Sequence, residues 1–77
     1  MPGRGAEVPG LRGARMRLAL TQEELAEKSG IGRATIARLE TGSRAGMVTL
    51  RKLAAALDTT PAALQEDRDR PRYEEAA

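Results

Sequence analysis

Residues 21–42 read TQEELAEKSGIGRATIARLETG, and this stretch decides the fold. It opens with a capping box, in which the Thr21 hydroxyl accepts a hydrogen bond from the amide of Glu24 while the Glu24 side chain accepts one from the amide of Thr21. A helix is therefore predicted to begin after Thr21. It is expected to end at Gly30, because glycine suits the left-handed conformation that follows a helix end.

The second half of this stretch predicts another short helix over residues 33–41, ending before Gly42. Ile36 and Leu39 are three positions apart and therefore share one face, which we expect to point into the core. The outward positions are then Arg33, Ala34, Ala37, Arg38 and Thr41. Two helices of this length, joined by a few residues that include glycine, form a helix-turn-helix.

Three further helices are predicted around this pair. The first covers about residues 8–18 and places four side chains on one face, namely Leu11, Ala14, Arg15 and Leu18. After a loop over residues 43–46, Met47 is expected to pack just before a fourth helix over residues 48–57. The fifth is short, with Thr60 as its N-cap and Pro61 at its first position. The fold class is therefore all-α, with five short helices around one aliphatic core.

The chain divides into three parts by composition. Residues 1–8 contain glycine and proline and little to bury, so we expect a flexible N-terminal arm. Residues 9–65 form the helix-turn-helix domain, and residues 66–77, which are nearly all charged, form a flexible tail. Leu57, Leu64 and the fifth helix are the expected surface for a dimer. Because only a short segment follows the fifth helix, regulation is expected to come from a partner or from protein concentration.

The composition of the 77 residues excludes most chemistry. The chain has no His and no Cys, so it lacks an imidazole base, a thiolate nucleophile and the usual ligands of a zinc site. We therefore expect no enzyme activity, no metal and no cofactor. A single Tyr and no Phe or Trp also disfavour proteins that stack single-stranded bases on aromatic rings. No apolar run is long enough to cross a membrane, and a cytoplasmic protein is expected.

The net charge of +2 hides an uneven distribution. Residues 31–57 carry five basic side chains against one acid, whereas residues 21–30 and 66–77 are net acidic. A basic region on a small domain is often only solvated surface, so charge alone does not identify a nucleic-acid partner. It indicates where such a partner would bind.

The motif in residues 21–42, followed by Thr49, Leu50, Leu53, Ala54 and Leu57, resembles the lambda repressor/Cro (XRE-type) helix-turn-helix family of bacteria and phages. The resemblance covers about residues 9–65. It implies that the helix beginning at Arg33 is a recognition helix lying in the major groove of double-stranded DNA. Two departures stand out: Gly32 occupies a position often filled by Ser, and the stretch between Gly42 and Thr49 is one residue short and lacks a proline.

The resemblance also implies a role for individual residues. Arg33 and Arg38 would read base edges, since arginine bonds bidentately to guanine, and Ala34 and Ala37 would offer methyl groups to thymine. The candidate phosphate contacts are Gln22, Thr35, Thr41, Ser43 and Arg44. Arg15 and Glu40 are expected to form a partly buried, structural ion pair.

The predicted function is a sequence-specific transcriptional regulator, a repressor that binds a pseudo-palindromic operator as a homodimer. A dimer in solution and a monomer that dimerises only on DNA are equally compatible with the sequence. Two alternatives remain open at this stage. One is a small antitoxin or restriction-modification control protein, which binds DNA while serving a partner protein. The other is a helix-turn-helix scaffold used only for protein interaction. Arginine on the recognition face favours DNA over protein as the partner.

Overall fold

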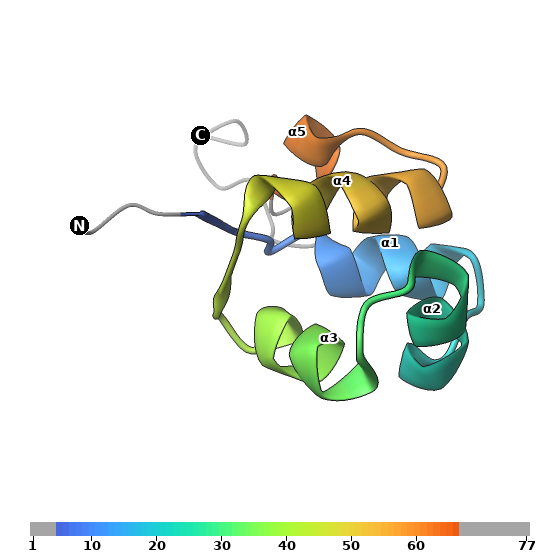
Figure 1. Cartoon of the computed structure of the whole chain (residues 1–77). Coiled ribbons are helices and arrows are strands. Elements are labelled where there is room, and N and C mark those ends of the chain that lie inside the picture. The colour runs from blue at the N-terminus through green and yellow to red at the C-terminus, as the bar shows by residue number, and fades with distance from the viewer. Residues whose placement is uncertain (1–4, 67–77) are drawn as a thin grey trace.

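The computed structural model describes residues 5–66. In chain order the elements are β1 (Ala6–Glu7), α1 (Leu11–Arg17), α2 (Gln22–Ser29), α3 (Arg33–Glu40), β2 (Arg44–Ala45), α4 (Met47–Ala56) and α5 (Pro61–Leu64). Figure 1 shows α1 and α4 at the centre, with α2 and α3 together on one side and α5 on the other. The predicted five-helix fold is confirmed, and a two-stranded antiparallel sheet is added to it. The tail over residues 67–77 and the first four residues of the arm lie outside the described residues.

Local signals in the sequence set both ends of α2 and the beginning of α5 as predicted. The Thr21 hydroxyl accepts from the Glu24 amide at 2.9 Å, and the Glu24 carboxylate accepts from the Thr21 amide at 2.8 Å, so the capping box is complete. Gly30 closes α2 with a φ of 79°, in the left-handed region. At α5 the Thr60 hydroxyl accepts from the Ala63 amide at 3.1 Å. Each cap satisfies a backbone amide that the helix itself leaves unpaired.

Every helix contributes leucine, isoleucine or alanine side chains to the core, and Val8 and Ala45 join it from outside the helices. Ile36 and Leu39 of α3 are buried as their spacing predicted. Leu57 and Leu64 are also buried, with exposed fractions of 4% and 0%. The prediction that Leu57 and Leu64 form a dimer surface was therefore wrong, because both side chains are used by the domain's own core. Helical periodicity identifies an apolar face without telling whether that face meets the same chain or another one.

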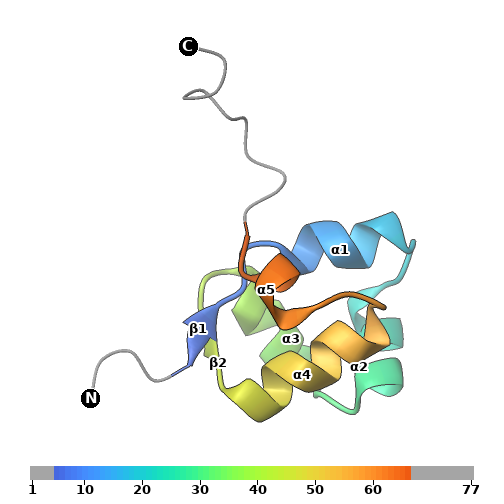
Figure 2. The same cartoon turned by 90° about the horizontal axis from the view of Figure 1, so that it is seen from above.

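The predicted flexible arm was wrong for residues 5–8. Ala6 pairs with Ala45 and Glu7 with Arg44, so β1 and β2 lie side by side in Figure 2 and the predicted 43–46 loop contains a strand. Gly5 has a φ of 74°, and a Cβ built there would lie 2.6 Å from the Ala45 carbonyl oxygen. Val8 then enters the core with an exposed fraction of 2%. Burial of Val8 and the strand pairing hold this segment in place.

The ends of α1 and α4 also differ from the prediction. Helix α1 begins at Leu11 rather than near residue 8, because the chain first turns so that the Gly10 amide donates to the Leu64 carbonyl at 2.9 Å. Leu18 lies past the end of α1 and is 44% exposed instead of facing inward. Met47 opens α4 and is 53% exposed, so the expected packing of this side chain was also wrong.

Candidate nucleic-acid interface

Helix α3 presents one basic and one apolar face. Arg33, Ala34 and Arg38 are exposed, whereas Ile36 and Leu39 are buried against the core. The two remaining positions that were predicted to face outward are split, because Ala37 is half-buried while Thr41 is exposed. Thr35, a predicted phosphate contact, is half-buried as well. The helix lies at the edge of the molecule in Figure 1, with α2 beside it. Its exposed face is therefore open to a large, flat or grooved partner.

Helix α3 is held to α1 by an ion pair between Arg15 and Glu40. Arg15 Nε donates to Glu40 Oε2 at 2.7 Å, and Arg15 Nη2 donates to Glu40 Oε1 at 3.1 Å. The two side chains are only 12% and 5% exposed. Arg15 Nη1 also donates to the Leu20 carbonyl at 2.8 Å, which ties the turn between α1 and α2 to the same guanidinium. One arginine thus joins three segments of the fold.

The charge of Arg15 is secure in this position. Its hydrogen bond to Glu40 raises the pKa of the guanidinium, burial opposes that effect, and the negative charge of Glu40 reinforces it. Arginine is already cationic at any physiological pH. The ion pair is therefore a fixed feature of the folded protein and not a switch.

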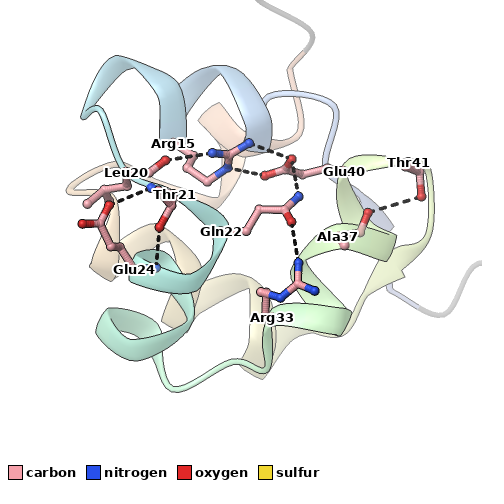
Figure 3. Close-up of polar contacts among 9 residues, drawn as sticks. All are labelled: Arg15, Leu20, Thr21, Gln22, Glu24, Arg33, Ala37, Glu40 and Thr41. Carbon is pink, nitrogen blue, oxygen red and sulfur yellow. Dashed lines mark hydrogen bonds and ion pairs between the residues drawn. The ribbon is translucent and has the colours of Figure 1, made fainter.

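Gln22 connects this ion pair to the first residue of α3, as Figure 3 shows. Gln22 Nε2 donates to Glu40 Oε1 at 3.1 Å, and Gln22 Oε1 accepts from Arg33 Nη1 at 3.3 Å. The sequence predicts Gln22 as a phosphate contact and does not reveal this bridge. Nothing in the local sequence reveals it, since the bridge joins residues that are far apart in the chain.

The hydroxyl groups of α3 and of the turn after it differ in whether their proton is available to a ligand. Arg38 Nη2 donates to the Thr35 hydroxyl at 3.3 Å, which leaves the hydroxyl proton of Thr35 available. The Thr41 hydroxyl instead donates to the backbone, to the Arg38 carbonyl at 2.9 Å and the Ala37 carbonyl at 3.3 Å. Since a phosphate only accepts hydrogen bonds, Thr41 is a poorer candidate contact than Thr35. Ser43 is exposed on the turn that follows.

Arg44 has an acidic neighbour that the sequence does not predict. In the antiparallel pair of β1 and β2 it lies directly opposite Glu7. Opposite charges at facing positions of a sheet attract each other, so Glu7 lowers the positive potential around Arg44. This pairing could not be predicted because β2 is only two residues long, too short to show a strand pattern in the sequence.

A shallow hollow lies where α1, α2 and α3 meet. Its lining comprises Arg15, Thr21, Gln22, Glu23 and Arg33. It combines the beginning of α2, where the helix dipole favours negative charge, with two arginines. Among residues 5–66, no group of three or more acidic side chains could hold a metal ion. Within the same range no helix is both long and apolar enough to span a membrane.

Comparison with known proteins identifies this architecture. The helix-turn-helix family profile matches residues 11–64, most of the described chain. The chain belongs to the lambda repressor-like helix-turn-helix family. Within this helix-turn-helix protein, α2 and α3 are the two helices that name the family, and α3 is the recognition helix. The predicted general function, a DNA-binding transcriptional regulator, is confirmed by this membership.

Two solved structures are similar to this helix-turn-helix protein. One is the restriction-modification controller protein C.AhdI from Aeromonas hydrophila, 40% identical, with a TM-score of 0.67, covering 70% of this chain and 83% of that chain. The other belongs to a SinR protein/SinI protein complex, 22% identical, with a TM-score of 0.70, covering 90% of this chain and 71% of that chain. At the lower identity the likeness concerns the fold alone. No curated protein sequence matches the chain.

Proposed function

We propose that the protein is a sequence-specific repressor that binds a pseudo-palindromic DNA operator as a homodimer, with α3 in the major groove. The observation that carries the proposal is the exposed face of α3, to which the helix contributes Arg33, Ala34 and Arg38 and no acidic side chain. Glu40, the one acid of α3, is turned inward to Arg15. The exposed face is thus cationic and carries the donors that base edges require.

Base reading is assigned to four residues of α3. Arg33 and Arg38 donate to guanine O6 and N7, and the Ala34 and Ala37 methyl groups contact thymine. Ala37 is half-buried, so its contact needs a close approach of the helix to the groove. Arg33 stands at the beginning of the helix, the end that reaches base edges in this motif.

Contacts to the phosphate backbone of DNA are assigned to polar residues in and around α3. Thr35, Ser43 and Arg44 are proposed to donate to phosphates, and Gln22 is proposed to do so through the second N–H of its amide, since the first is used by Glu40. Thr41 contributes less because its proton is used within the helix. These contacts would set the register of the protein on the duplex without reading sequence. Each neutralised phosphate releases counterions, so affinity should fall steeply with salt.

A homodimer follows from the size of one recognition helix. A single helix reads few base pairs, and two copies related by a twofold axis would read half-sites about 34 Å apart. Leu57 and Leu64 are buried in the domain core, so the dimer contact must use other residues. We assign no catalytic activity to the protein and place its action in the cytoplasm.

A control protein of a restriction-modification system is the second candidate. The observation that favours it is the 40% identity to C.AhdI, described as a restriction-modification controller protein. Such a protein would also bind DNA through α3, so the two candidates share one interface and differ in the genes they regulate. A partner protein would then complement the DNA contact rather than replace it.

Selection of bound duplexes from a randomised library tests the proposal. We expect enrichment of two inverted half-sites about 10 base pairs apart, and binding that weakens steeply as salt rises. Arg33→Ala should abolish the preference at one position of each half-site, whereas Arg51→Ala, on exposed α4 surface, should leave every preference intact. If no duplex is enriched, the protein does not read DNA sequence and the proposal is wrong.

A further inference from the structure

The Gln22 amide has a single chemically consistent orientation. On one side it meets Glu40, whose ionised carboxylate can only accept hydrogen bonds. On the other side it meets Arg33, whose guanidinium can only donate them. The amide must therefore turn its NH2 group to Glu40 and its oxygen to Arg33. The reverse orientation would place oxygen against oxygen and donor against donor.

The group that imposes this orientation is itself held by several contacts. Glu40 is 5% exposed and receives two bonds from Arg15, which in turn is anchored to the Leu20 carbonyl. The chain of contacts thus runs from α1 through Glu40 of α3 to Gln22 of α2 and back to Arg33 at the start of α3 (Figure 3). Its buried end is rigid, and its exposed end is the side chain to which base reading is assigned.

We infer that Glu40 is a positioning residue for base reading: by accepting from Gln22 Nε2 it keeps the Gln22 oxygen toward Arg33 and so holds the Arg33 guanidinium in one place. The inference rests on the proposed function, because it needs Arg33 to contact a base. Glu40 itself lies at the inner end of the chain of contacts, away from the exposed face of α3. Its effect on recognition passes through Gln22.

The variant Glu40→Gln should reverse the orientation of the Gln22 amide while hardly changing the shape of the side chain at position 40. The shortest contact, 2.7 Å from Arg15 Nε, keeps an oxygen at the Oε2 position. The new NH2 group then occupies the Oε1 position, where it faces Gln22 and gives up the 3.1 Å bond from Arg15 Nη2. Gln22 must turn its oxygen inward to accept from it, and its own NH2 group comes to oppose Arg33. The Arg33 contact is lost although residue 40 stays polar and of the same length.

The exchange Gln22→Glu with Glu40→Gln restores the contacts that lead from position 40 through position 22 to Arg33 without changing net charge, while the bond from Arg15 Nη2 stays lost. The glutamine at position 40 would keep its oxygen for Arg15 and donate to the carboxylate at position 22, which would accept from Arg33 as well. Gln22→Glu alone places two carboxylates against each other with no donor between them. Absolute affinity can fall in every variant that carries Gln22→Glu, since a carboxylate there repels phosphate, so the informative quantity is the preference between bases.

The experiment uses the duplex that the wild-type protein selects from a random library, at about 0.15 M salt. For each variant the affinity is compared between this duplex and one changed only at the base pair that Arg33→Ala affects. We expect Arg33→Ala to lose a preference of about 5- to 150-fold. Glu40→Gln should lower that preference about two- to tenfold, and the exchange variant should return it towards wild type.

A matched control separates positioning from loss of stability. Thr60→Ala removes the N-cap of α5, far along the chain from Arg33, and should lower thermal stability without changing base preference. All affinities are measured at a temperature where circular dichroism shows every variant folded. If Glu40→Gln does not fold, Gln22→Glu compared with the exchange variant makes the same test.

The possible failures are distinguishable. If no duplex is selected, or if Arg33→Ala changes no base preference, the assignment of Arg33 to base reading is wrong and the inference falls with it. If Arg33→Ala abolishes the preference but Glu40→Gln leaves it intact, the function stands and the positioning role is refuted. The positioning role is also refuted if the exchange variant fails to recover the base preference, or if Thr60→Ala lowers that preference as much as Glu40→Gln does.

Discussion

Replacing Glu40 by alanine removes the carboxylate that joins α1, α2 and α3. Arg15 loses both of its bonds to Glu40, at 2.7 and 3.1 Å, and Gln22 loses the acceptor of its amide. Arg15 is only 12% exposed, so water does not fully replace the missing partner. The variant leaves a mostly buried positive charge with one remaining bond, to the Leu20 carbonyl.

The cost can be placed near the lower end of the range for such changes. Breaking a buried ion pair by removing one partner costs about 3–5 kcal/mol, and the remaining bond of Arg15 to Leu20 favours a value of about 3 kcal/mol. A domain of this size has about 3–9 kcal/mol of stability in total. Each kcal/mol shifts the unfolding midpoint of a small domain by about 4–8 °C, so we expect a decrease of about 12–24 °C.

Thermal unfolding followed by far-UV circular dichroism measures this decrease, and urea unfolding gives the free energy. The matched control is Glu27→Ala, which removes an exposed glutamate from α2. Exposed substitutions of this kind change stability by less than about 0.5 kcal/mol. If Glu40→Ala unfolds at the same temperature as Glu27→Ala, the ion pair does not stabilise the fold and the reasoning is refuted.

The difference between wild type and Glu40→Ala should not depend on pH around neutrality. The pKa of Arg15 is raised in the folded state, first by its hydrogen bond to Glu40 and further by the charge of Glu40, while burial opposes the effect. A cation with a raised pKa contributes stability that is fully present below its unfolded pKa and is lost only as the pH rises through the folded value. That window lies above the ordinary pKa of arginine, so the midpoint difference should be the same from about pH 6 to about pH 9.

Three further predictions concern stability alone, each measured by urea unfolding. Val8→Ala should cost about 1.5–2.5 kcal/mol because Val8 is buried. An unchanged free energy of unfolding would mean that residues 5–8 form a flexible arm after all. Ala19→Gly should gain up to about 1 kcal/mol, since Ala19 has a φ of 56° that glycine adopts without strain; a loss would contradict this. Gly10→Ala should cost about 1–3 kcal/mol, because its Cβ would lie 2.5 Å from the Glu66 carbonyl oxygen. Gly46→Ala adds a Cβ that would have no neighbouring atom within 4 Å, so this variant should be close to neutral. Equal costs at Gly10 and Gly46 would refute the steric argument.

The parts of the fold that the sequence predicted are those that depend on neighbours along the chain. The capping box of Thr21 and Glu24 and the left-handed Gly30 act within one or two turns of a helix. Ile36 and Leu39 follow from helical periodicity in the same way. Each signal involves residues at most four positions apart, so the sequence alone contains the whole interaction.

The parts that sequence reasoning missed depend on which segments meet in space. A strand of two residues has no periodicity to detect, so the pairing of Glu7 with Arg44 could not be read from the chain. Leu57 was placed on a dimer surface because its apolar character does not reveal what covers it. The bridge through Gln22 requires the positions of three helices at once.

The Arg15–Glu40 pair was expected from the family resemblance, and its physical role is better explained by recognition than by stability. A well-packed apolar pair of similar volume often stabilises a fold as much as a buried ion pair does, or more. An apolar residue 40, however, offers Gln22 no acceptor, and the amide would be free to rotate away from Arg33. Selection for stability alone would therefore not require charge at this position.

The double variant Arg15→Met with Glu40→Leu separates these two roles. We expect its unfolding midpoint to lie within a few degrees of that of the wild type. Each kcal/mol lost to imperfect packing of the new pair would lower the midpoint by about 4–8 °C. Its preference at the base pair read by Arg33 should nevertheless fall as in Glu40→Gln, because Gln22 has lost the acceptor that orients it. The opposite result, a low midpoint with an intact base preference, would mean that the ion pair serves only to hold α1 against α3.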